Sequence, residues 1–202
     1  MKIQIKLLSD LCTCSGETYN SIVDTDVTYD ENGIPYIPAK RIRGCIREAG
    51  LEMLEFGLIS RQEYEKVFGK EGNQNSAFSL SNAYISDYEE VTEALQKTPF
   101  TELKSQQNVL DQYTATRTQT AVDLRTGVAD KNSLRTIRVV RKGLTFEADC
   151  NWKPKVSKGD SEKAFRPEIL GQAVSLVKHM GMSRTRGLGL VRMKLSDTAG
   201  ER

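Results

Sequence analysis

The residues best suited to chemistry lie near the end of the chain, between residues 181 and 192. These twelve residues hold three glycines and three arginines, and they run into an apolar, strand-like tail from Leu190 to Leu195. Glycine lets a backbone approach a ligand and expose its N–H groups, and arginine offers a planar fork that suits phosphate. The residues expected to bind the backbone of a nucleic acid are Arg184, Arg186, Gly187 and Gly189. A glycine helix end followed by a solvated strand is the alternative interpretation.

A second group of basic residues lies on a helix predicted from Ala39 to about Phe56. At about 100° per residue, apolar side chains fall on one side of this helix and basic ones on the other. The basic stripe comprises Lys40, Arg43 and Arg47, and Arg41 lies off it. No acid occurs before Glu48, and cations at a helix N-terminus are unfavourable against its dipole unless an anion is present. We predict that these cations bind phosphate; a solvated basic face is the alternative.

Composition limits the possible partners less than the placement of the charges does. The 202 residues carry a net charge of only +2, with 38% hydrophobic and 28% charged residues. Basic residues gather at 40–47 and 135–142, and acidic residues gather at 24–31 and 87–93, so one face can bind a polyanion. No apolar run of about 18 residues exists, and the start of the chain alternates like a strand, which predicts a cytoplasmic protein without a membrane span.

The cysteines and the histidine do not indicate a metal centre. Cys12 and Cys14 form a C-x-C pair, and Cys45 and Cys150 lie in helix or strand patterns, so we expect reduced thiols. His179 is the only histidine of the chain. A multi-histidine metal site within one chain is therefore excluded, and no histidine-based triad is evident. We expect His179 to lie at the C-terminal end of a helix.

Periodicity predicts an α+β fold. The expected strands span 2–12, 77–85, 133–140, 144–150 and 190–195, and the expected helices span 39–56, 60–69, 87–97 and 162–180. Ser60 and Glu63 form a capping box, and residues 141–143 look like a hairpin turn between two strands. The order indicates a ferredoxin-like or RRM-like βαββαβ core in one domain, 1–202, with insertions at about 57–76 and 98–132. We expect parts of 98–132 to order only on a partner.

Several motifs together resemble one family. The run from Val23 to Arg47 contains an acidic segment, a turn, the element Ile34-Pro35-Tyr36-Ile37-Pro38 and the step Arg43-Gly44. It is similar to the N-terminal motif of the RAMP superfamily, and above all to backbone subunits of type III CRISPR–Cas effector complexes. Residues 183–189 resemble the glycine-rich loop of this family. Residues 114–140 resemble its thumb-like β-hairpin, and their pattern is nearer to the type III-D than to the III-A branch.

The resemblance implies an RNA-guided ribonucleoprotein of antiviral defence. Such subunits assemble side by side on CRISPR RNA with other effector subunits, and base pairing reads the target RNA. Their thumbs interrupt the guide–target duplex at intervals, and in cleaving members an aspartate near the thumb supports metal-dependent cutting of target RNA. Alignment of the Pro-rich element places this aspartate on Asp24, with Mg²⁺ or Mn²⁺ as the implied cofactor. Arg184, Arg186 and the α-helical cations would hold the guide.

Asp24 is thus the candidate catalytic residue and the candidate metal ligand. A carboxylate can hold Mg²⁺ at a phosphodiester, and attack by the internal ribose 2′-OH needs no positioned water. Asp26 is a second catalytic candidate, because residues i and i+2 share a face of a regular strand. The alternative is that Asp24 caps a turn beside Asp26 and Asp30.

Three other functions remain open. The chain can be a cleavage-inactive scaffold that only binds guide and target RNA. It can also be a guide-processing ribonuclease, for which Tyr19 is the available acid or base because His179 stands alone. A generic RRM-like RNA binder is the third, and it would stay monomeric with guide RNA.

Overall fold

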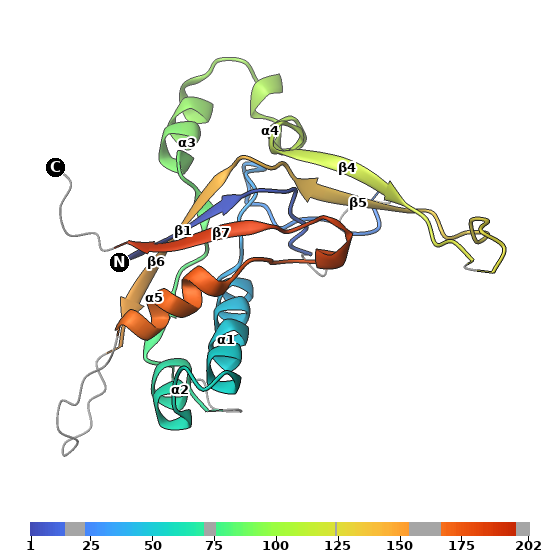
Figure 1. The fold of residues 1–202 in the computed structure, drawn as a ribbon. Helices are drawn as coiled ribbons and strands as arrows, with labels where there is room; N and C mark the ends of the chain where they lie inside the picture. The colour runs from blue at the N-terminus through green and yellow to red at the C-terminus, as the bar shows by residue number, and fades with distance from the viewer. Residues whose placement is uncertain (15–22, 71–75, 124, 154–166, 197–202) are drawn as a thin grey trace.

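The main body of the protein is built on an antiparallel sheet of five strands. The computed structural model describes residues 1–14, 23–70, 76–123, 125–153 and 167–196. The strands are β1 (Lys2–Leu7), β2 (Phe78–Leu80), β3 (Tyr84–Ile85), β6 (Thr145–Trp152) and β7 (Val191–Ser196). Their order is β2-β6-β1-β7, with β3 also paired to β6, and each neighbouring pair is antiparallel. The first and last strands of the chain are therefore neighbours at the centre and edge of the sheet (Figure 1).

The helices are α1 (Ala39–Glu55), α2 (Arg61–Phe68), α3 (Tyr88–Lys97), α4 (Gln106–Tyr113) and α5 (Pro167–Leu176), with the short 3₁₀ turns η1 (Glu102–Lys104) and η2 (Arg184–Arg186). In Figure 1, helices α1, α2 and α5 lie below the strands, and α3 and α4 lie above them. Helices α1 and α5 pack against each other, and α5 also packs on β7. Within the described residues, no helix has the length and apolar character needed to cross a membrane.

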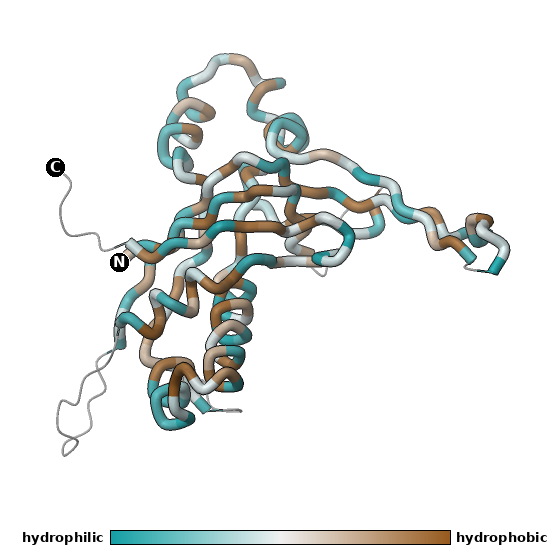
Figure 2. Tube along the Cα trace, in the orientation of Figure 1, coloured by the Kyte–Doolittle hydropathy of each residue, from teal (hydrophilic) through white to brown (hydrophobic). Residues whose placement is uncertain are grey.

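Alternation along the central strand explains how the sheet forms a core. Ile3, Ile5 and Leu7 of β1 are buried, whereas Gln4 and Lys6 between them are exposed. The buried residues belong to one hydrophobic cluster with apolar residues of α1 and α5, so one face of the sheet is covered by these helices. Figure 2 shows hydrophobic residues along the strands and along α5 and α1.

A separate two-stranded hairpin projects from the body (Figure 1). Its strands, β4 (Thr114–Gln119) and β5 (Arg135–Val140), pair in antiparallel register from Thr114 with Val140 to Gln119 with Arg135. The root of the hairpin is fastened to the segment after β1, since Leu11 and Val140 exchange two backbone hydrogen bonds of 2.9 and 2.7 Å. Helix α4 leads directly into β4, so the hairpin grows out of the end of a helix.

The mixed α+β class and most local elements agree with the sequence-based expectation. The helix expected from Ala39 ends at Glu55, and the acidic helix spans Tyr88–Lys97. The capping box is confirmed: Glu63 N donates to Ser60 Oγ at 3.2 Å, and Ser60 N donates to Glu63 Oε2 at 2.8 Å. Residues 98–132, which the sequence left unassigned, contain η1, α4 and β4.

Three local expectations were wrong. Residues 133–140 and 144–150 do not pair as a hairpin, because β5 pairs with β4 and β6 pairs with β1 and β2. The strand expected at 77–85 is two short strands. Helix α5 ends at Leu176 because the following residues pair instead with the segment before β7: Met180 N donates to Gly189 O, and Val191 N donates to Lys178 O. His179 therefore lies beyond the helix, in a bridge to Leu190.

Candidate nucleic-acid interface

The N-terminal end of α1 carries positive charge without an acid to balance it. The helix starts after Pro38, whose extended backbone (φ −61°, ψ 137°) offers no side-chain cap. Asn82 supplies a cap from a distant part of the chain, since Ala39 N donates to Asn82 Oδ1 at 3.0 Å. The first turn holds no acidic residue, and both Lys40 and Arg41 are exposed there. This helix end therefore attracts anions.

The arginines of α1 point in two directions. Arg43 donates to Phe78 O at 3.3 Å and lies 5.9 Å from the centre of the Phe78 ring, and Arg47 donates to Tyr64 Oη at 3.2 Å. Both arginines thus turn toward β2 and α2. Arg41 turns the other way and donates to Cys14 O at 3.2 Å.

The glycine-rich loop meets α1 on the flank of Arg41. Arg184 Nη1 lies 3.1 Å from Glu48 Oε2 in an exposed ion pair. Burial raises the pKa of the Cys45 thiol, and the positive charges of Arg184 and Arg41 both oppose this rise. Arg41 and Glu48 are seven residues apart, which is about two turns, so they share one flank of α1. A hollow of about 330 Å³ lies here, between α1, the end of α5 and η2. Arg41 and Arg184 can therefore bind the same anionic strand.

The predicted stripe on α1 and the loop do not lie on one flank of the helix. Arg43 and Glu48 are five residues apart, which is about 140° around a helix at about 100° per residue. Arg43 contacts Phe78, whereas Glu48 contacts Arg184. The sequence reasoning set Arg41 apart from the stripe, yet Arg41 is the α1 arginine that joins the loop. A track that includes both Arg43 and the loop would have to pass around α1.

The glycines of the loop differ in what they do. Gly189 has φ +73°, and a Cβ there would lie 1.9 Å from Met180 O. Its N–H donates to Asp10 O at 2.8 Å, so this amide serves the fold and its predicted contact with RNA has no support here. Gly187 has φ +78° but faces open space. Gly187 and the exposed Arg186 beside it are accessible to a ligand.

The acidic segment that contains Asp24 and Asp26 lies beside strand β5 at the root of the hairpin. Strand β5 is far from this segment in the sequence. Asp24 is exposed, and it is joined to β5 by two hydrogen bonds: Asp24 N donates to Thr136 O at 2.8 Å, and Thr136 N donates to Asp24 Oδ2 at 2.6 Å. Thr25 forms a parallel bridge with Ile137. The alternative role as a turn cap belongs to Asp30, whose Oδ1 accepts from Asn32 N and Ile34 N.

Asp26 has a different environment from Asp24. Its side chain is 4% exposed, and its Oδ1 lies 3.1 Å from Nε of Arg138, which is itself 7% exposed. This Nε is not aligned for a hydrogen bond and has no other partner among the described residues, so the contact is one of charge. Asp24 is therefore exposed to solvent, whereas the carboxylate of Asp26 is buried in an ion pair with Arg138.

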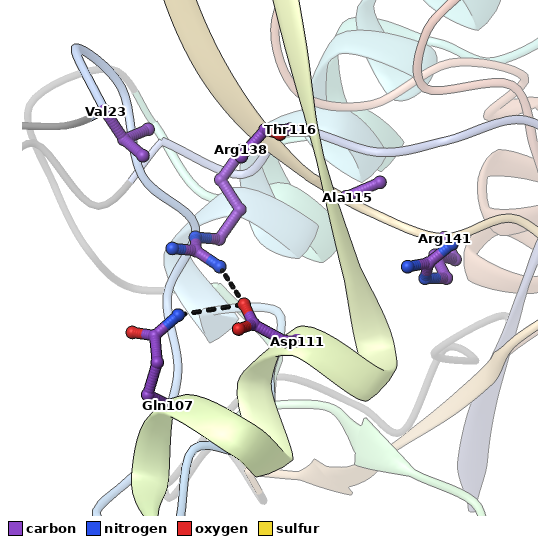
Figure 3. Close-up of a pocket in the computed structure, with 7 residues that line it drawn as sticks. All are labelled: Val23, Gln107, Asp111, Ala115, Thr116, Arg138 and Arg141. Carbon is purple, nitrogen blue, oxygen red and sulfur yellow. Dashed lines mark hydrogen bonds and ion pairs between the residues drawn. The ribbon is translucent and has the colours of Figure 1, made fainter.

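A hollow of about 540 Å³ opens beside these residues. It is lined by Val23, Gln107, Asp111, Ala115, Thr116, Arg138 and Arg141. Figure 3 shows the Arg138 guanidinium and the Gln107 amide both directed at the Asp111 carboxylate, with donor distances of 2.8 Å. The hollow combines polar groups from α4, β4 and β5 with the aliphatic side chain that precedes Asp24. It can receive a part of a nucleotide that carries both polar and flat apolar surface.

The open face of the sheet carries cations that the sequence reasoning did not single out. Lys6 of β1 stands opposite Arg192 of β7, and Gln4 stands opposite Lys194. All four are exposed. Like charges directly opposite each other are unfavourable unless an anion lies between them. The alternation within each strand was visible in the sequence, but only the register brings Lys6 and Arg192 together.

Asp24 fits a divalent cation only as a single protein ligand. No group of three or more His, Cys, Asp or Glu side chains that could hold a metal occurs in the described part of the chain. Mg²⁺ is often held by one or two carboxylates and the phosphates of a bound substrate. Asp24 suits this arrangement, because it is exposed and, among the described residues, its Oδ2 accepts from Thr136 N while its Oδ1 accepts no hydrogen bond.

A family model describes the same stretch of chain that builds the sheet, the hairpin and the loop. The model of the RAMP superfamily matches residues 4–192. The chain belongs to the RAMP superfamily. The family resemblance read from the sequence motifs is thereby confirmed. No curated protein matches the sequence.

Solved structures with the fold of this RAMP chain come from type III-B Cmr-beta complexes. One, from the complex bound to cognate target RNA, superposes with a TM-score of 0.66 at 15% identity, covering 96% of this chain and 95% of the other. Another, from the apo state, gives a TM-score of 0.68 at 14% identity, with 98% and 97% covered. The likeness extends over the full length of both chains and concerns the fold.

The RAMP chain thus does not bring its predicted residues together at one place. Arg41 and the loop of Arg184 and Arg186 lie along one flank of α1, and Arg43 and Arg47 turn toward β2 and α2. Asp24 lies beside β5 of the hairpin. Sequence reasoning missed Asp10 and Asp111, which hold the hairpin: Asp10 pairs with Arg117 of β4 and accepts from Lys142 N at 2.9 Å. No local motif marks either aspartate. Tyr19, the acid or base considered for guide processing, lies outside the described residues.

Proposed function

We propose that this RAMP chain is an RNA-binding subunit of a type III CRISPR effector complex and that it cuts target RNA at the root of its hairpin. The guide would be CRISPR RNA, and its neighbours would be copies of this chain and other type III subunits. The observation that carries the proposal is the position of Asp24. This carboxylate is exposed, yet its Oδ2 accepts a hydrogen bond from Thr136 N, and the backbone of Asp24 is fixed to β5 because Asp24 N donates to Thr136 O. A hollow lined by arginine lies beside it.

Guide binding would use the cations near the N-terminal end of α1. Arg41 lies on the flank of α1 where Arg184 pairs with Glu48, and Arg186 is exposed beside Gly187. Lys40, on the stripe with Arg43 and Arg47, is exposed at the start of α1. Arg43 and Arg47 would contact RNA only on the α2 side, where each already has a partner. Arginine forks on a phosphate backbone give affinity without base specificity, as a guide of variable sequence requires.

The architecture supports two finer statements. We propose that the sheet and its two helices form a ferredoxin-like core, because β1, α1, β2, β6, α5 and β7 follow the βαββαβ order. We also propose that β4 and β5 act as a thumb that enters the guide–target duplex. The projection of the hairpin away from the body supports this second proposal (Figure 1).

Cleavage would follow transesterification within the target RNA. The 2′-oxygen forms a bond to the adjacent phosphorus, the bond from phosphorus to the 5′-oxygen breaks, and the proton passes from the 2′-hydroxyl through solvent to the leaving oxygen. A bound Mg²⁺ or Mn²⁺ would neutralise charge on the phosphate. Asp24 would hold this ion while Thr136 N–H keeps its carboxylate in place. The expected products carry a 2′,3′-cyclic phosphate and a 5′-hydroxyl.

The test compares the wild type with Asp24→Ala in the complex assembled on guide RNA. We expect the variant to lose metal-dependent cutting of a complementary target by about 100-fold or more, while guide and target binding stay within about two-fold, since the carboxylate acts on the reacting phosphate. Asp30→Ala is a matched control, because Asp30 caps a turn. If the wild-type complex binds target but does not cut it with Mg²⁺ or Mn²⁺, the chain is a scaffold and cleavage is rejected.

A further inference from the structure

Arg138 is an almost fully enclosed basic side chain at the root of the hairpin. Its guanidinium contacts three segments of the chain at once. Nε lies 3.1 Å from Asp26 Oδ1, and Nη1 donates to Asp111 Oδ1 at 2.8 Å and to Thr114 Oγ1 at 3.3 Å. Its backbone N–H also donates to Thr25 O at 2.9 Å. One residue thus ties the acidic segment to α4, β4 and β5.

Stability alone is a weak reason for such an arrangement. Removing two charges from water costs several kcal/mol per ion, so a buried ion pair often stabilises no more than apolar residues of the same volume. A buried pair does, however, select one arrangement among several, because any other leaves a charge unpaired. The question is which arrangement this pair selects.

The acidic segment offers two competing arrangements. Asp24 and Asp26 are two residues apart, and a strand that slips by two residues keeps the same side chains on the same face. Such a slip would place Asp24 on the buried guanidinium and move Asp26 out. In the structure the contact with Arg138 belongs to Asp26, whose Oδ1 also accepts from Val27 N at 2.8 Å. Asp24 is left exposed and bonded to Thr136.

We infer that Arg138 is a positioning residue that fixes the register of the acidic segment on β5 and so sets where the Asp24 carboxylate meets RNA. Because Arg138 is part of β5, a shift of the hairpin moves Asp24 with it. Contact of the hairpin with RNA would therefore be coupled to the placement of the carboxylate. This inference rests on the proposed cleavage by Asp24, and it adds the residue that regulates that site.

Two variants loosen the contact without leaving a buried acid unpaired. Arg138→Lys keeps the charge beside Asp26 but lacks the planar fork that also reaches Asp111 and Thr114. Asp111→Asn removes the partner on α4, whose side chain is 54% exposed, and leaves the pair with Asp26 intact. Glu93→Gln removes an exposed ion pair on α3 and is the control. Circular dichroism and thermal unfolding of each full chain establish that it folds.

The first measurement is hydrogen exchange of the backbone amides of Asp24, Thr136 and Arg138 in the full-length chain. These amides make the contacts between the acidic segment and β5, and we expect their exchange to accelerate about ten-fold in Arg138→Lys and less in Asp111→Asn, since local opening sets their protection. Glu93→Gln should exchange as the wild type does. Unchanged exchange in both variants would overturn the inference, whether or not the protein cuts RNA.

The second measurement is single-turnover cutting by the complex at saturating target. A displacement of about 1 Å can cost about 100-fold in rate, so we expect Arg138→Lys to cut about 10–100-fold more slowly with target affinity unchanged. A rate equal to that of the wild type, in a variant whose amides exchange faster, would reject control of Asp24 by Arg138. If the wild-type complex does not cut target RNA, the proposed cleavage is rejected instead. The hydrogen-exchange rates then test, without any activity, whether Arg138 fixes the register of the acidic segment on β5.

Discussion

The two arginine-rich regions of this protein differ in how their ion pairs are exposed to solvent. Around α1 and the glycine-rich loop, the ion pair of Arg184 with Glu48 is 41% and 57% exposed on its two side chains. At the hairpin root, Arg138 and Asp26 are almost fully enclosed. The same residue type is held loosely in one place and rigidly in the other.

The difference suits the role proposed for each region. An exposed ion pair is worth little and is readily exchanged for another partner, so Arg184 can leave Glu48 for a phosphate. A buried ion pair is costly to break, so Arg138 keeps its geometry whether or not RNA is bound. The first region suits binding to a strand of any sequence. The second suits fixed placement of a reactive group.

A small shared core joins the two regions. Cys12, Ile137, Val139 and Leu188 form one buried cluster, which brings together the segment after β1, strand β5 and the residue that follows Gly187. Gly181 packs on the same segment, because a Cβ there would lie 2.3 Å from Cys12 O. The placement of the loop and the placement of the hairpin therefore depend on the same few residues.

The largest effect should come from Arg138→Gln. This change leaves the Asp26 carboxylate buried without the positive charge of Arg138, so we expect a loss of about 3–5 kcal/mol in the free energy of unfolding. Denaturant unfolding of the full chain measures the loss. Arg184→Gln, on the exposed side of the comparison, should cost less than about 1 kcal/mol. Equal losses for the two variants would remove the contrast between the regions.

The second prediction separates two glycines of the loop. In Gly189→Ala, the positive φ costs about 1–2 kcal/mol and the clash with Met180 O adds about 1–3 kcal/mol. Gly187→Ala meets open space, so only the cost of φ applies. Thermal and denaturant unfolding compare the two variants. If Gly187→Ala proves as unstable as Gly189→Ala, the assignment of Gly187 to the accessible surface is wrong.

The third prediction probes the shared core through pH. Burial, and to a smaller extent the neighbouring Cys14 and Asp26, raise the pKa of the Cys12 thiol from its ordinary 9.0 to about 11. In the unfolded chain this thiol loses its proton at a lower pH than in the folded chain. The contribution of Cys12 to the free energy of unfolding is therefore fully present below pH 9 and is lost as the pH rises to about 11. The free energy of unfolding should fall by up to about 1.4 kcal/mol per pH unit relative to Cys12→Ala. Parallel pH curves for the two proteins would show that Cys12 is not enclosed.

Local signals in the sequence were sufficient for the helices but not for the hairpin. The capping box of Ser60 and the amphipathic pattern of α1 depend only on neighbouring residues, so both could be predicted. Periodicity recognised strand β5 but gave it the wrong partner, because Arg141-Lys142-Gly143 looks like a turn and β4 alternates weakly. A hairpin over residues 114–140 was expected only from the resemblance to a family. The pairing of β5 depends on contacts with the main sheet. Gly143 N donates to Leu7 O, and this hydrogen bond directs the chain from the hairpin back to β1.

The site was predictable in its residue types and not in its contacts. Asp24 came from a motif shared with a family, and its exposed position is consistent with that choice. The partner of Asp26 could not be predicted, since Arg138 lies in a distant strand and no spacing rule connects them. Arg41 is a second example of a contact that spacing cannot predict. A helical wheel gives the angle of Arg41 on α1, but only the tertiary structure shows that the glycine-rich loop reaches that flank.

The smallest predicted effect concerns Glu48 and tests the exposed side of the comparison most directly. Glu48→Gln frees Arg184 and removes one negative charge near the expected path of the guide. A unit charge at 4 Å in water is worth about 1 kcal/mol, so guide RNA should bind about five-fold more tightly at low salt. Arg184→Gln should instead reduce the slope of log K against log salt by about 0.7. Fluorescence anisotropy at several salt concentrations measures both, with Glu93→Gln as a variant of equal charge far from the loop. Weaker binding by Glu48→Gln would mean that the ion pair preorganises Arg184 for RNA, and the loop would then resemble the hairpin root rather than contrast with it.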